Sequence, residues 1–139
     1  MTESPSRIYS RACAPVCLTA AGGSLYYLLE ILLRGFSHWT MAVCGGICLA
    51  SIYYLDRALR ESPLLLRAAL GAAVITVVEL AAGCLLNLHL GLAIWDYSLH
   101  RHHLWGQISI YASARWFLLC IPVCAGCGLL EKYVFGGTE

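Results

Sequence analysis

The sequence predicts an all-α integral membrane protein: a bundle of four transmembrane helices with both termini in the cytosol. Of its 139 residues, 60% are hydrophobic and only 12% are charged, whereas a soluble domain carries about 25% charged residues. The mean hydropathy is +0.72, and the apolar residues gather in four long runs separated by short polar stretches. Because the length is that of one domain, we expect residues 12–132 to form a single transmembrane domain.

The first two runs are each long enough to cross a bilayer, which takes about 20 residues. Residues 1–11 are polar and are expected to form a cytosolic tail, and the first span covers about 12–33. Arginines before an apolar run also occur in secretory signals, but this run is long for one, so we interpret it as a transmembrane helix. The second span covers about 38–55 and is followed by a charged stretch, 56–61, that we expect to be a loop.

The third run is too long for a simple span. It covers about 64–95, after Ser62 as N-cap and Pro63 in the first helical turn. At about 1.5 Å per residue, such a helix exceeds the ~30 Å hydrocarbon core by roughly half. We therefore expect it to tilt, project or break near 87–91. The fourth span covers about 105–130, and residues 133–139 form a second cytosolic tail.

The distribution of Lys and Arg predicts the orientation. With four spans, the side that holds both termini carries most of the basic residues, and the positive-inside rule places that side in the cytosol. The basic residues of the cytosolic side are Arg7, Arg11, Arg57, Arg60, Arg67 and Lys132, and those of the other side are Arg34 and Arg101.

Ionisable residues within the spans are candidates for function, because each is unfavourable in lipid by about 2.5 to 3.5 kcal/mol unless it faces a partner or a cavity. Glu30 and Arg34 are spaced as a favourable helical pair. Thr76, Glu79, Gly83 and Asn87 share one helix face, and polar residues recur at 107, 111 and 115. We hypothesise that Glu79 and Arg115 pair inside the bundle, as a functional pair or only to fix helix register. The candidate substrate-binding residues are Glu30, Glu79, Asn87, Asp96, Tyr97, Gln107 and Arg115.

The third and fourth runs meet at Trp95-Asp96-Tyr97-Ser98, followed by a cluster with His100, His102 and His103. An aspartate between two aromatic residues at a membrane rim needs partners, and Asp96 can cap the fourth span or accept hydrogen bonds from Trp105 or Gln107. The histidines, with Asp96 and His38, have the residue types of a metal site, but their spacing matches no zinc template. We assign no metal and no catalytic residue.

The eight cysteines all lie inside apolar runs. Most are spaced three or four residues apart, as on one face of a helix. We interpret them as small apolar residues that let helices approach closely, and we expect no disulfide framework within the spans.

Several motifs together resemble a known family. They are Thr76-x-x-Glu79-x-x-x-Gly83-x-x-x-Asn87, Trp95-Asp96-Tyr97-Ser98, Gly106-Gln107-Ile108, Arg34-Gly35-x-Ser37-His38-Trp39 and the 41–46 stretch. The chain resembles, over about 22–131, the short bacterial members of the ABC-transporter type IV family, also called CmpB-like membrane proteins. This resemblance implies a multi-pass protein of a bacterial inner membrane. The chain departs from the family pattern at Arg101 and His103, where Pro-x-Asn is usual, at Ser109, where the family favours Cys, and at Arg115, which is usually apolar.

Three functions are consistent with these features. The first is transport of a cation or small polar solute, by a homo-oligomer or with separate partner subunits. The second is a non-transporting binding or scaffold protein, and the third is an interfacial enzyme that modifies a lipid. No phosphate-binding GxxxxGK[ST] motif occurs, so no cofactor is assigned and any ATPase is a separate polypeptide. The expected partners are membrane lipids, and the net charge of +1 indicates no nucleic acid.

Overall fold

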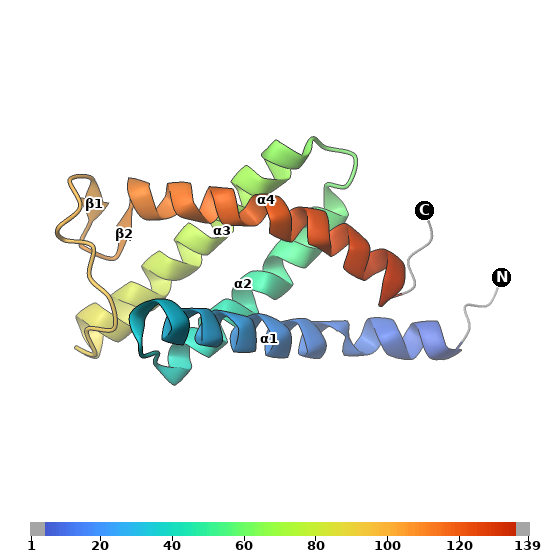
Figure 1. The fold of residues 1–139 in the computed structure, drawn as a ribbon, viewed down its shortest axis with the longest axis horizontal. Helices are drawn as coiled ribbons and strands as arrows, with labels where there is room; N and C mark the ends of the chain where they lie inside the picture. The colour runs from blue at the N-terminus through green and yellow to red at the C-terminus, as the bar shows by residue number, and fades with distance from the viewer. Residues whose placement is uncertain (1–4, 136–139) are drawn as a thin grey trace.

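The computed structural model describes residues 5–135 and is almost entirely helical (Figure 1). Four long helices are present in this part of the chain: α1 (Pro5–Arg34), α2 (Trp39–Ala58), α3 (Leu64–Gly83) and α4 (Ile110–Tyr133). A π-helical turn, η1 (Cys84–His89), extends α3. Two short strands, β1 (His103–Leu104) and β2 (Ile108–Ser109), pair antiparallel just before α4.

Each of the four helices is long and apolar enough to cross a membrane, as the hydropathy predicted. The candidate spans are Arg11–Arg34, Trp39–Ala58, Leu64–His89 and Ile110–Tyr133. Helix α1 begins seven residues earlier than the expected span, because it continues through the polar stretch that starts at Pro5. The tails predicted at 1–11 and 133–139 lie partly outside the described residues.

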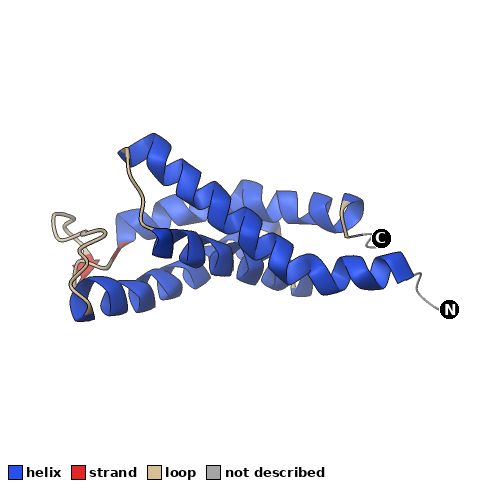
Figure 2. Ribbon diagram, turned by 90° about the horizontal axis from the view of Figure 1, so that it is seen from below, coloured by secondary structure: helices blue, strands red, loops and turns tan. Residues whose placement is uncertain are grey.

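With an even number of spans, the first helix should begin and the last helix should end at the same end of the bundle. Helix α1 begins and α4 ends at one end of the molecule, whereas the α1–α2 turn and the segment 90–109 lie at the other (Figures 1 and 2). We call 90–109 the connecting segment, because it joins η1 to α4. The assignment of the two ends to cytosol and exterior stays a prediction.

The third and fourth spans are shorter than predicted. The helix ends at His89 and not at Trp95, and it breaks within the stretch 87–91. Gly91 there has φ +68, a conformation that a helix cannot continue and that glycine adopts without strain. Helix α4 begins at Ile110 and not at 105, because Ser109 is its N-cap and accepts a hydrogen bond from the Ala112 amide at 3.1 Å.

Two features of the stretch between α2 and α3 also differ from expectation. Helix α2 continues to Ala58, so Asp56 lies in a helix. Asp56 is also only 1% exposed. The N-cap of α3 is Pro63, not Ser62, and no side chain caps this helix. A charged stretch such as 56–61 is normally exposed to solvent and therefore predicts a loop. Asp56 is instead buried with ionic partners.

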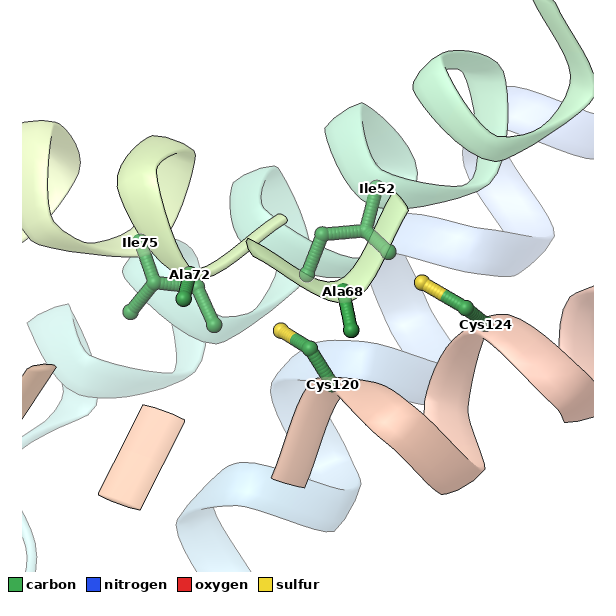
Figure 3. Close-up of a cluster of buried hydrophobic side chains, with 6 residues drawn as sticks. All are labelled: Ile52, Ala68, Ala72, Ile75, Cys120 and Cys124. Atoms are coloured by element: carbon green, nitrogen blue, oxygen red, sulfur yellow. The ribbon is translucent and has the colours of Figure 1, made fainter. Parts of the chain in front are cut away.

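Small residues hold the helices together. Helices α2, α3 and α4 meet in a cluster of mostly small side chains in which the cysteines are packed as apolar groups (Figure 3). Its members are Ile52, Ala68, Ala72, Ile75, Cys120 and Cys124. Helices α1 and α2 approach through glycines: a Cβ on Gly46 would lie 2.5 Å from the Thr19 carbonyl oxygen, and one on Gly23 2.5 Å from that of Ala42.

Candidate functional site

Glu79 lies near the middle of the third span and is held by two neutral donors. The Tyr97 hydroxyl donates to its Oε1 at 2.7 Å, and the Trp116 indole Nε1 donates to its Oε2 at 3.2 Å. Tyr97 comes from the connecting segment and Trp116 from α4, so the carboxylate joins three parts of the chain. These bonds give both carboxylate oxygens a hydrogen-bond partner, as buried polar groups require. Neither donor carries a positive charge that would balance the carboxylate.

The predicted pairing of Glu79 with Arg115 is wrong. Arg115 is exposed, and among the described residues no salt bridge joins it to Glu79, so it acts on the carboxylate only over a longer range. The physical reason is the phase of α4. The stripe 107, 111, 115 was traced from Gln107, which precedes the helix, whereas the face towards α3 contains Ser113, whose Oγ lies 2.9 Å from the Thr76 Oγ1.

A signal for the correct face is present in the sequence. The cysteines at 120, 124 and 127 are buried, and helical spacing traced back from Cys120 leads to Trp116 and then Ser113. Following the apolar stripe instead of the polar one would have identified Trp116 as the partner of Glu79.

A cavity of about 320 Å³ lies between the four helices, and Glu79 is part of its wall. The remaining lining is mostly aliphatic, with aromatic rings contributed by Tyr26, Trp95 and Trp116. The Tyr26 and Trp116 rings lie next to each other in this wall, with centroids 6.1 Å apart and an interplanar angle of 43°. Among the described residues that line this cavity there is no other carboxylate and no Lys, Arg or His. The volume is within the range of small-molecule sites.

The connecting segment covers this end of the bundle and is fixed by two of the predicted residues, Asn87 and Gln107, and by their neighbours. The Asn87 Nδ2 donates to the Gln107 Oε1 at 2.8 Å and to the Trp95 carbonyl at 3.0 Å, and its Oδ1 accepts from the Ile94 amide at 2.7 Å. The Trp95 Nε1 donates to the Gln107 carbonyl at 3.0 Å. Gln107 and Trp95 are both buried. This network supplies hydrogen-bond partners to backbone groups of the connecting segment, which has no helix of its own to satisfy them.

Asp96 is exposed and forms a local turn, not a contact with the bundle. Its Oδ1 accepts from the Ser98 amide at 2.8 Å and from the Ser98 hydroxyl. These two bonds hold the pKa of Asp96 below its usual value. The alternatives that Asp96 caps the fourth span or accepts from Trp105 or Gln107 are wrong, since Ser109 is the cap and the Gln107 Nε2 donates to the Trp105 carbonyl at 2.9 Å.

Tyr97, the next residue, points the opposite way, towards Glu79. Burial and then the nearby Glu79 carboxylate raise the pKa of the Tyr97 hydroxyl above its ordinary value. The hydroxyl therefore stays protonated and serves as a donor. Its ring also stacks on that of His100, with centroids 5.2 Å apart.

The histidines of the connecting segment support its turns. The His100 Nδ1 lies 2.7 Å from the Ser109 Oγ, and the His103 Nδ1 accepts from the Gly106 amide at 2.9 Å. In the part of the chain that the structure describes, no group of three His, Cys, Asp or Glu side chains converges on a common metal position.

Glu30 is buried and holds Arg34, which in turn bonds α1 to the connecting segment. The Arg34 Nη1 donates to its Oε1 at 2.8 Å and the Ser37 Oγ to its Oε2 at 2.6 Å, while the Arg34 Nη2 donates to the Ile94 carbonyl at 2.8 Å. The predicted Glu30–Arg34 pair is thus confirmed. Glu30 does not line the cavity.

A second ionic cluster lies at the opposite end of the bundle, around Asp56. Its Oδ1 is 2.5 Å from the Arg67 Nη1 and its Oδ2 is 3.1 Å from the Arg60 Nη2. Glu131 lies at the same end and accepts from the Tyr53 hydroxyl. The sequence does not predict this cluster, because arginines near the ends of spans are also the ordinary topology signal of the positive-inside rule.

The structure therefore brings some predicted site residues together and separates others. Glu79 meets Tyr97, and Asn87 meets Gln107, whereas Glu30 forms its own cluster and Asp96 and Arg115 are exposed. Whether any of these residues binds a substrate stays a prediction.

Comparison with known proteins identifies the family. The family model described as "Putative ABC-transporter type IV" matches residues 24–133, which include the cavity residue Glu79 and the whole connecting segment. The chain matches no curated protein and no solved structure. With most of its length covered by the model, the chain belongs to the ABC-transporter type IV family. The family and the four apolar helices together indicate a multi-pass membrane protein.

Proposed function

We propose that this protein is a transporter subunit of a bacterial inner membrane and that it binds a cationic solute at Glu79. The observation that carries the proposal is the position of this carboxylate on the wall of a cavity between the helices. Its donors, Tyr97 and Trp116, are neutral, so a cation would supply the missing counter-charge. Ionisable residues inside spans that face a cavity are typically part of a substrate or ion pathway.

The same geometry favours a cation over a neutral polar solute. A polar solute needs several hydrogen-bonding groups around it, and the cavity offers few apart from Glu79 and the Tyr26 hydroxyl. The lining instead provides negative charge, aromatic rings and apolar surface.

Transport by this chain would require further subunits, either copies of itself or different proteins. Small residues on one helix face, such as Cys120, Cys124 and Gly128, are the usual candidates for such contacts. Cys120 and Cys124 are buried inside the bundle, however, and pack against Ala68 and Ala72, so another surface of the bundle would form the interface. An ATPase, if the complex has one, would be among the partners.

A non-transporting scaffold is the second candidate. It is favoured by the hydrogen bonds that already occupy both oxygens of Glu79 and by the network around Asn87. In that case Glu79 would only fasten the connecting segment to the bundle.

Cation flux separates the two candidates. The protein is purified from its native membrane with the subunits it retains, reconstituted into vesicles, and supplied with K⁺, Na⁺ or tetraethylammonium under an imposed membrane potential. Transport predicts a flux that Glu79→Gln abolishes and that Glu131→Gln leaves intact. Flux unchanged by Glu79→Gln, or no flux of any cation, supports the scaffold.

Glu131→Gln is the matched control. Like Glu79, Glu131 accepts a hydrogen bond from a tyrosine hydroxyl, that of Tyr53, but it lies at the other end of α4 and does not line the cavity. The variant therefore removes the negative charge of a carboxylate that accepts from a tyrosine, here one that also lies 3.7 Å from the Arg57 Nε, without altering the cavity.

A further inference from the structure

We propose that the ligand of the Glu79 cavity is a lipophilic organic cation, such as a quaternary ammonium with apolar substituents, and not a metal ion. This inference rests on the proposed function and names its substrate class. It is carried by the chemistry of the cavity wall, in which a lone carboxylate is surrounded by apolar and aromatic side chains.

An inorganic cation is poorly suited to this wall. Ca²⁺ and Mg²⁺ need about six or more oxygen ligands, and other hard cations likewise exchange their hydration shell for several oxygen atoms. The side-chain oxygens of the lining are those of Glu79 and the Tyr26 hydroxyl. A dehydrated metal ion would lack most of its ligands here. The lining cysteines do not supply a site for a soft metal either, because no three metal-ligating side chains converge among the described residues.

An organic cation finds a complementary surface. Its charge would be balanced by the Glu79 carboxylate, each oxygen of which has a second lone pair beyond the one that Tyr97 or Trp116 uses. Its substituents would contact the aliphatic wall. The Tyr26 and Trp116 rings are part of the cavity wall, and a quaternary ammonium is attracted to the faces of such rings. The cavity volume of about 320 Å³ accommodates such a molecule.

The experiment compares two probes of the same shape. Benzyltrimethylammonium and its neutral isostere neopentylbenzene are titrated into the full chain in detergent, with binding followed by calorimetry and by the thermal unfolding midpoint. We expect saturable binding of the cation and at least tenfold weaker binding of the neutral isostere. Guanidinium and Na⁺, which lack apolar substituents, should leave the midpoint unchanged.

Two pairs of variants locate the site. Glu79→Gln should weaken benzyltrimethylammonium binding at least tenfold, whereas Glu131→Gln should not change it. Trp116→Leu should weaken it by about threefold to tenfold, and Trp39→Leu should have no effect, because Trp39 is 68% exposed and lies outside the cavity. If Glu79→Gln does not fold, the comparison of the two isosteres in the unaltered protein still tests the need for positive charge.

Equal binding of the two isosteres would overturn the inference and identify the cavity as a site for neutral apolar molecules. Absence of any binding would also overturn it. Flux of an inorganic cation that depends on Glu79, without binding of benzyltrimethylammonium, would leave the proposed function standing and refute the substrate class alone. Absence of both flux and binding would refute both.

Discussion

Tyr97 is a single residue whose hydrogen bond joins the connecting segment to Glu79 of α3. Its hydroxyl donates to Glu79 at 2.7 Å, and a hydrogen bond to a charged group contributes about 1.5 to 3 kcal/mol. We expect Tyr97→Phe to lower the free energy of unfolding by about that amount in a denaturant titration. Tyr111→Phe, at a position where the residue is 53% exposed, is the control and should change it by less than about 0.5 kcal/mol. Equal effects of the two variants would contradict the bond.

Substitution of Asp56 is the single change that we expect to lower the free energy of unfolding most. It is buried beside Arg60 and Arg67, so its removal leaves guanidinium groups without their counter-charge. We expect Asp56→Asn to destabilise the protein by about 3 to 5 kcal/mol, measured as loss of the free energy of unfolding. Glu61→Gln, an exposed position in the same turn, provides the comparison. A mild effect of Asp56→Asn, like that of Glu61→Gln, would show that the cluster is not formed.

Asp96 provides a test of the turn in the connecting segment. Because the Ser98 hydroxyl and amide hold its pKa down, its carboxyl should titrate below the ordinary aspartate value in an NMR experiment. Ser98→Ala should move the pKa back up. The lowered pKa implies a stabilisation that is complete above the ordinary aspartate pKa and is lost as the pH falls through the folded-state pKa. A Ser98→Ala variant with an unchanged Asp96 pKa would rule out this geometry.

At the scale of the elements, the contact between α1 and α2 depends on glycine. A Cβ on Gly46 would lie 2.5 Å from a backbone oxygen of α1, whereas one on Gly126 in α4 would meet nothing within 4 Å. We expect Gly46→Ala to destabilise the protein by about 1 to 3 kcal/mol, because the helices must separate.

The matched variant Gly126→Ala should be neutral or stabilising by up to about 1 kcal/mol, since alanine favours a helix over glycine. Thermal unfolding of both variants measures the difference. If both variants destabilise the protein by the same amount, the close approach of α1 and α2 does not depend on Gly46.

The helices themselves could be predicted from the sequence, and so could a possible break near 87–91, whereas the phases of the helices and their exact ends could not. Long apolar runs are sufficient to predict four spans, because lipid requires every backbone group to be bonded within a helix. The end of the third span at His89 depends on Asn87 bonding to Ile94, Trp95 and Gln107. Such contacts between distant residues have no local pattern. The orientation of α4 was missed for a different reason, because the polar stripe was extended from Gln107, which lies outside the helix.

At the scale of the whole molecule, the bundle has ionic or polar clusters at both ends and one carboxylate in its cavity. The cluster around Asp56 lies at one end, and the network of Asn87, Gln107 and Trp95 fixes the connecting segment at the other. In both clusters the polar side chains bond one another or nearby backbone groups, and these bonds hold the helices in place. Glu79 differs from both, because it is a carboxylate whose hydrogen-bond donors, Tyr97 and Trp116, carry no charge, and because it lines the cavity of about 320 Å³. This asymmetry is the physical basis for assigning the binding role to Glu79.

Infrared difference spectroscopy of the protein in lipid, with its glutamates labelled with ¹³C, tests this assignment most directly. Addition of benzyltrimethylammonium should perturb the carboxyl band of one glutamate. This change should be absent in Glu79→Gln and retained in Glu131→Gln. A spectrum that the cation does not alter, or that it alters equally in Glu79→Gln, would contradict the claim that Glu79 binds a cationic solute.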